Sequence, residues 1–119
     1  MTSNKTLIKH ITDAIQERKG QQITLVDLTG LDNSVCDYFV ICEGNSNTQI
    51  LAITDHIEDY VRKQCKAKPY SCEGQRNALW IAMDYGDIMV HIFNHEARQF
   101  YDLEHLWSDA ALTEIPSLS

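Results

Sequence analysis

Hydrophobic positions repeat with a helical period in two long segments of the chain. Leu7, Ile11 and Ile15 recur three or four residues apart, which predicts an amphipathic helix over about residues 4–18 that ends at Gly20. The same period over residues 48–66 predicts a second, longer helix, which Pro69 would end. We expect a short third helix from about His95.

The segments between these helices have the composition of β-strands. Residues 23–28 (ITLVDL) are rich in β-branched side chains, and residues 38–42 (YFVIC) are apolar throughout, as expected of a central strand covered on both faces. Two more strands are expected around Tyr85-Gly86, and a short one could lie within residues 70–78.

The order of these elements, α-β-β-α-β-β-α, predicts the fold class. It is typical of a single α/β domain, a mixed β-sheet with flanking helices that form an α/β sandwich, over residues 1–110. We expect residues 111–119 to form a loosely held, flexible C-terminal tail.

The predicted hairpin at residues 79–93 has two different faces. With Tyr85-Gly86 as a two-residue turn, Trp80 would lie opposite His91 and Asp84 opposite Asp87. One face is entirely apolar and is expected in the core: Leu79, Ile81, Met83, Ile88, Val90 and Ile92. The other mixes aromatic, histidine and carboxylate side chains, as an exposed interface does: Trp80, Ala82, Asp84, Asp87, Met89, His91 and Phe93.

The acidic residues are concentrated in the same part of the chain. Residues 79–119 hold seven acids against one base, Arg98, and so carry −6 of the formal net charge of −7. The seven acids are Asp84, Asp87, Glu96, Asp102, Glu104, Asp109 and Glu114. Acidic and aromatic residues in one segment indicate a surface that binds a basic partner.

Composition narrows the class of protein further. The net charge argues against direct sequence-specific binding of nucleic acid, which requires a basic patch. No apolar run approaches the roughly 18 residues of a membrane span, and the N-terminus lacks the features of a secretory signal. We therefore expect a cytoplasmic protein without membrane contact, although a processed organellar protein would look the same. The four cysteines form no Cys-x-x-Cys motif, and we expect reduced thiols, no metal and no cofactor.

Three residues leave an enzymatic alternative open. Ser46 lies in a Gly-Asn-Ser turn between a strand and a helix, and Asp84 and Asp87 could pair as carboxylates, as in a residual nucleotidyltransferase. However, residues 47–55 contain no two acids separated by one residue, which such an enzyme needs close after the turn. A capped helix start and two turn-forming acids are the simpler interpretations.

Several motifs, taken in order along residues 5–110, resemble the ribosomal silencing factor (Iojap) family. They are Asp37-Tyr38-Phe39-Val40-Ile41-Cys42, Gly44-Asn45-Ser46, Glu73-Gly74, Trp80, Asp84-Tyr85-Gly86-Asp87, Val90-His91-Ile92-Phe93, Arg98-Gln99-Phe100-Tyr101 and Leu103-Glu104-x-Leu106-Trp107. The resemblance implies a nucleotidyltransferase-like α/β fold that is not known as an enzyme. It also implies binding to the fourteenth protein of the large ribosomal subunit, which blocks joining of the small subunit and lowers translation when nutrients are short.

The resemblance also implies which residues make the contact. They are Trp80, Tyr85, Asp87, His91, Phe93, Arg98 and Tyr101, together with Glu104 and Trp107. The aromatic side chains would supply buried area, Asp87 and Glu104 would pair with basic residues, and His91 could add a hydrogen bond whose charge depends on pH. A third interpretation is self-association, with a homodimer covering the aromatic face.

Overall fold

A computed structural model describes residues 3–31, 34–107 and 109–117 of the 119-residue chain. Its helices and strands are α1 (Asn4–Glu17), β1 (Gln21–Asp27), β2 (Tyr38–Glu43), α2 (Asn47–Cys65), β3 (Ser71–Glu73), β4 (Trp80–Asp84), β5 (Ile88–Phe93), α3 (His95–Tyr101), a 3-10 helix (Leu103–His105) and β6 (Ala111–Ile115). The strands form one six-stranded sheet in the order β3-β4-β5-β2-β1-β6. β2 and β5 are parallel and the other neighbours are antiparallel, so the predicted mixed α/β sheet is confirmed.

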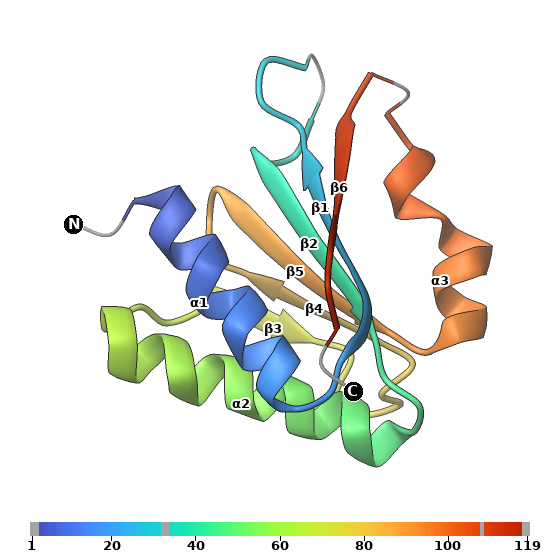
Figure 1. The fold of residues 1–119 in the computed structure, drawn as a ribbon. Coiled ribbons are helices and arrows are strands. Elements are labelled where there is room, and N and C mark those ends of the chain that lie inside the picture. The colour runs from blue at the N-terminus through green and yellow to red at the C-terminus, as the bar shows by residue number, and fades with distance from the viewer. Residues whose placement is uncertain (1–2, 32–33, 108, 118–119) are drawn as a thin grey trace.

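Helices cover both faces of this sheet (Figure 1). α1 and α2 lie side by side on one face and bury an aliphatic core that includes Ile11, Ile15, Ile53 and Ile57. α3 lies on the other face, over a smaller core of Val26, Leu28, Phe39, Ile41 and Phe93. β2 is buried on both faces, as the unbroken apolar run of residues 38–42 predicts.

Local sequence explains where the helices begin and end. The hydroxyl oxygens of Ser3 and Ser46 accept hydrogen bonds from backbone N–H groups in the first turns of α1 and α2. α2 ends at Cys65, because Lys66 adopts a left-handed conformation with φ of 56°, three residues before the predicted stop at Pro69.

The β4–β5 hairpin turns one residue later than predicted. The backbone N–H of Tyr85 donates to the carbonyl of Ile88, so the two loop residues are Gly86 and Asp87. Gly86 has a φ of +90°, which a residue with a side chain rarely adopts and which favours glycine at the first position of this kind of turn. Trp80 therefore lies opposite Phe93, not opposite His91. The pairing is shifted by two residues, so the two faces of the hairpin keep the predicted residues.

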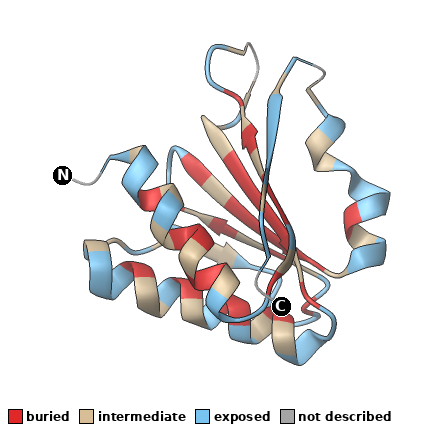
Figure 2. Cartoon of the chain, viewed as in Figure 1, coloured by how far each residue is buried: buried red, intermediate tan, exposed pale blue. Residues whose placement is uncertain are grey.

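Two predictions are wrong, one about burial and one about secondary structure. Leu79, expected in the core, precedes β4 and is exposed. Residues 111–115, expected within a loosely held tail, form β6, which pairs with β1 over its full length. Their side chains are mostly exposed, because the strand lies at the sheet edge and is held there by backbone hydrogen bonds to β1 (Figure 2). In the described part of the chain, no helix is long and apolar enough to cross a membrane.

Candidate functional site

The structure does not bring the predicted contact residues together on one surface. Asp87 and Tyr101 are exposed, whereas Trp80, Glu104 and Trp107 are partly buried. Tyr85, His91, Phe93 and Arg98 are buried. The expectation of a fully exposed second hairpin face is wrong, because α3 and the following turn cover the end of the face that holds His91 and Phe93.

Tyr85 and Asp87 lie far from the other predicted residues. Tyr85 directly precedes the β4–β5 turn and Asp87 is its second loop residue, whereas Phe93 lies six residues beyond Asp87, about 20 Å at the rise of an extended strand. Tyr85 packs into the core beneath α1 and α2, where burial and then the nearby Glu58 raise the pKa of its phenol. The Asp87 carboxylate accepts a hydrogen bond from the Asn4 amide at 3.3 Å.

Trp80, His91 and Phe93 form an aromatic cluster beneath α3. The Trp80 ring stacks on Phe93 with centroids 5.1 Å apart and contacts Tyr101 of α3 at 4.5 Å. The indole N–H of Trp80 donates to Nδ1 of His91 at 3.0 Å. Trp107 packs edge-on against Phe39 at 5.7 Å and so covers the same core from the chain that follows α3. This cluster fixes the orientation of the Trp80 ring, because neighbours restrain it on several sides.

His91 lies buried, away from the exposed position that a pH-dependent contact with a partner would need. Burial lowers the pKa of its imidazole to about 4, so the ring is neutral in the physiological range. Nδ1 accepts the indole hydrogen, which places the ring proton on Nε2. His91 is thus an internal acceptor for Trp80.

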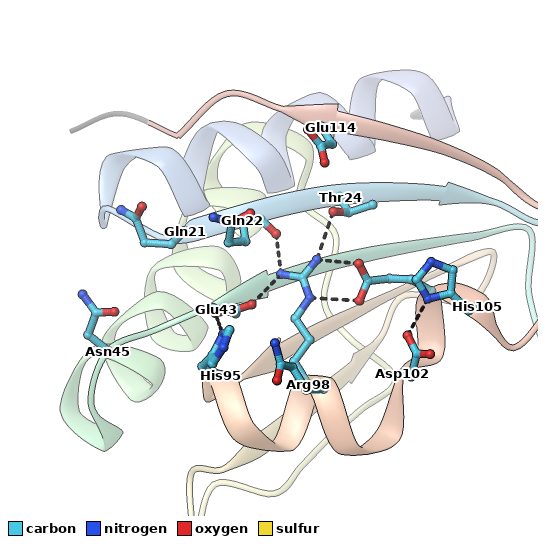
Figure 3. A pocket seen from close by; sticks show the side chains of 12 residues that line it. Gln21, Gln22, Thr24, Glu43, Asn45, His95, Arg98, Asp102, His105 and Glu114 are labelled. Atoms are coloured by element: carbon cyan, nitrogen blue, oxygen red, sulfur yellow. Dashed lines mark hydrogen bonds and ion pairs between the residues drawn. The ribbon is translucent and has the colours of Figure 1, made fainter.

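Arg98 is the centre of a buried ionic network (Figure 3). Its guanidinium donates to both carboxylate oxygens of Glu104, at 3.0 and 2.9 Å, and to Glu43 at 3.2 Å. It also donates to the carbonyl of Gln22 and to the hydroxyl of Thr24. Burial alone would lower the pKa of Arg98, but Glu104 and Glu43 hold it above its usual value, so the cation persists. Arg98 and Glu104 therefore satisfy each other and link α3 to β1 and β2, whereas we had expected them to contact a partner.

An apolar patch is exposed where α3 meets the start of β4. We define it as Trp80, Phe100 and Tyr101; the ring of Tyr101 lies 4.5 Å from that of Trp80 and 5.1 Å from that of Phe100, which is 81% exposed. Phe100 was absent from the predicted contacts. The helical period could have indicated it: when Arg98 points inward from α3, Phe100, two residues and about 200° further round the helix, points outward. Glu96 of the same helix and Asp102, which follows its last residue, are exposed and give the patch an acidic border.

The residues of the enzymatic alternative lie at opposite ends of the sheet. Ser46 follows β2 and caps α2, whereas Asp84 and Asp87 lie at the β4–β5 turn, beyond the other end of β2. The Asp84 carboxylate accepts the Gly86 N–H at 2.7 Å, which is the role of a turn former. Among residues 3–31, 34–107 and 109–117, no three carboxylate, histidine or cysteine side chains are grouped as metal ligands would be.

A polar hollow of about 800 Å³ lies beside the Arg98 network, between α3 and the strands β1 and β6. Its lining includes the carboxylates of Glu43, Asp102, Glu104 and Glu114, with Arg98 as the cation. His95 pairs with Glu43 and His105 with Asp102, and Asp102 raises the pKa of the His105 imidazole. The hollow is therefore acidic, and its charge favours basic groups.

Comparisons with known proteins identify the same family that the sequence motifs resemble. The model of the family described as "Ribosomal silencing factor during starvation" matches residues 1–119. The ribosomal silencing factor of Bacillus subtilis is 34% identical over 113 residues, covering 95% of this chain and 94% of that protein. The ribosomal silencing factor of Halalkalibacterium halodurans is 33% identical over 113 residues, with 95% of both chains covered.

Solved structures share the fold. A crystal structure of a Bacillus halodurans protein matches with a TM-score of 0.80 and 31% identity, covering 94% of this chain and 100% of that one. A crystal structure of a Chromobacterium violaceum protein matches with a TM-score of 0.84 at 24% identity, covering 99% and 93%. Motif order, fold and full-length similarity to named relatives converge, and the chain belongs to the ribosomal silencing factor family.

Proposed function

We propose that this chain silences ribosomes by binding the large ribosomal subunit at its fourteenth protein, where it sterically blocks joining of the small subunit under nutrient limitation. Its action is occlusion in the cytoplasm and requires no chemistry at the contact. The support is membership of a family described by ribosomal silencing during starvation. A mouse relative, 34% identical over 74 residues, is named for mitochondrial assembly of the ribosomal large subunit.

The apolar patch is the observation that carries the proposal. Three aromatic side chains form it, of which Phe100 and Tyr101 are exposed and Trp80 is partly buried, and exposed apolar groups beside charged ones are typical of protein interfaces. Trp80 is held in place by His91, Phe93 and Tyr101, so little conformational entropy is lost when a partner covers it. A rigid tryptophan with tyrosine and phenylalanine around it has the composition of a binding hot spot.

The charge of the surrounding surface favours a ribosomal partner. Glu96 and Asp102 border the patch, and the segment of residues 79–119 carries most of the net negative charge. Surfaces of ribosomal proteins are basic, so this charge would speed association and orient the complex. Among the nine predicted contacts, Trp80 and Tyr101 now define the proposed interface, while Asp87 would require a second contact about 20 Å away.

Co-sedimentation with purified large subunits tests the location of the interface. We expect Tyr101→Ala and Phe100→Ser each to weaken binding about tenfold or more, because each removes exposed aromatic area from the patch. Tyr70→Ala is the matched control: Tyr70 is as exposed as Phe100 but precedes β3. Equal binding by all three variants would move the interface off the patch.

Subunit joining tests the mechanism separately. Purified chain added to small and large subunits should lower the fraction of joined ribosomes in a sucrose gradient, and Tyr101→Ala should restore joining in proportion to its loss of binding. A chain that binds large subunits firmly yet leaves joining unchanged would contradict steric blocking.

Self-association through the same patch is a second proposal, favoured by the exposed apolar area. A homodimer would hide Phe100 and Tyr101 and compete with the ribosome. Sedimentation of the wild-type chain over a range of concentrations should then show a dimer that Phe100→Ser abolishes. A chain that stays monomeric at high concentration would contradict the dimer.

A further inference from the structure

The two edges of the sheet differ in how they are protected. β3 has three residues and is preceded closely by Pro69, and a short edge strand near a proline is a poor template for another strand. β6 has five residues, with no lysine, arginine or proline between Ala111 and Ile115. In the described ranges nothing pairs with its outer edge. One whole row of backbone donors and acceptors on β6 is therefore open to another strand.

The side chains of β6 give this edge a specific chemistry. Leu112 lies opposite Val26 and Glu114 opposite Thr24, so both point toward the α3 face of the sheet. Leu112 is 43% exposed, and it extends the row of apolar side chains outward from the buried Val26. An incoming strand would alternate its side chains in the same way, with one beside Leu112 and another, two residues away, beside Glu114.

The acidic hollow adjoins Glu114 and continues this surface. Of its other carboxylates, Glu43 and Glu104 are already paired with Arg98 and Asp102 with His105, and the Arg98 guanidinium has its donors engaged within the chain. Glu114 makes no ion pair among the described residues, and Figure 3 shows its side chain apart from the network. The hollow thus presents net negative charge next to the open edge, with Glu114 free to take a new cation.

We propose that β6 binds an extended basic segment of a partner protein as a seventh strand of the sheet. The segment places an apolar side chain on Leu112 and a lysine or arginine against Glu114, two residues apart. Backbone hydrogen bonds supply affinity, and the apolar and basic positions supply selectivity. A second copy of this chain fits the edge poorly, because β6 itself contains no basic residue and two copies with a charge of −7 repel each other.

A synthetic peptide tests the proposal with the full-length protein. The probe is a ten-residue peptide in which every second residue is threonine. The positions between the threonines are alternately valine and lysine, so that the apolar and basic side chains lie two residues apart. One control peptide has glutamate in place of lysine, and a second has a central proline that removes a backbone donor. We expect only the first peptide to bind, and we expect bound peptide to slow hydrogen exchange in residues 111–115 but not in 71–73.

Two charge reversals at the opposite edges serve as matched variants. Glu114→Lys should weaken the basic peptide about fivefold or more, because an attractive cross-strand pair becomes repulsive. Glu73→Lys makes the same change in β3 and should alter the affinity less than about twofold. Tyr101→Ala should leave peptide binding intact, which separates this site from the apolar patch.

Three outcomes would overturn the proposal. Equal weakening by the two charge reversals would make the attraction a general effect of net charge. Equal binding of the proline peptide would exclude strand addition. Protection of residues 111–115 that rises with protein concentration in the absence of peptide would identify a second copy as the occupant.

Discussion

On the face covered by α1 and α2, the buried side chains are almost all aliphatic, whereas the α3 face buries a histidine, aromatic rings and an arginine held between two glutamates. Aliphatic burial is non-directional and depends mainly on area and close packing. Hydrogen-bonded rings and ion pairs depend on orientation. The first face therefore stabilises the fold, and the second also sets the orientation of the exposed residues above it.

The comparison explains why the proposed interface lies on the α3 side. α3 has only seven residues and would not be stable alone, so its position depends on what holds it down. Arg98 ties it to β1 and β2, and Tyr101 rests on Trp80. Because these contacts hold the short helix against the sheet, α3 can leave Phe100 exposed and still keep its position.

Removal of the arginine should have the largest effect on stability. Arg98→Met leaves Glu43 and Glu104 mostly buried without their cation, which should lower the free energy of unfolding by about 3–5 kcal/mol. Urea denaturation measures this loss. Arg62→Met breaks an exposed pair with Asp59 in α2 and should cost less than about 1 kcal/mol. Similar losses in both variants would show that the network does not anchor α3.

A cavity in the aliphatic face should have the next largest effect. Ile53→Ala removes a fully buried side chain and should lower the free energy of unfolding by about 2–5 kcal/mol. Binding to large subunits should persist wherever the variant is folded, because Ile53 lies on the face opposite the apolar patch. Loss of binding by a folded Ile53→Ala chain would mean that the two faces are coupled.

The buried histidine should make stability depend on pH. The pKa of His91 is about 4 in the folded chain and near 6.5 when unfolded, so the unfolded state binds more protons between these values. Its contribution, up to about 3 kcal/mol, is fully present above pH 6.5 and is lost as the pH falls toward 4. Urea denaturation of wild type and His91→Phe at pH 7 and pH 5 should show a smaller loss in the variant.

His105 provides a control of opposite sign. Asp102 raises the pKa of this exposed imidazole, so its small contribution is present at low pH and is lost as the pH rises through the raised pKa. His105→Asn should therefore slightly reduce stability at pH 5 and leave it unchanged at pH 8.

A His91→Phe chain with the same pH dependence as wild type would contradict the assignment of a neutral buried ring.

Changes in the apolar patch should have the smallest effect on stability. Phe100→Ser alters a mostly exposed side chain and should change the free energy of unfolding by about 0.5 kcal/mol or less. Thermal unfolding followed by circular dichroism measures this. A large loss would mean that Phe100 supports α3, and the effect of the variant on ribosome binding would then need another explanation.

Local patterns in the sequence determined most of the fold. The helical periods of residues 4–18 and 48–66, the apolar run of 38–42 and the alternation around the hairpin are properties of neighbouring residues, and each predicted its element correctly. Strand β6 was missed because an edge strand with mostly exposed side chains has no alternating apolar pattern. The motifs also identified the family, because their order along the chain is written in the sequence itself.

Accessibility was decided only by the tertiary structure. The motifs of the sequence placed His91, Phe93 and Arg98 in a candidate interface. In the structure, α3 and Trp107 cover that end of the sheet, so these three residues are buried and support the exposed residues above them. Phe100 and Leu112 became accessible for the same reason, since burial depends on which distant segments pack above a side chain. The sequence alone determined the elements, the acidic character and the family of this protein; long-range packing decided which aromatic and charged groups still face a partner.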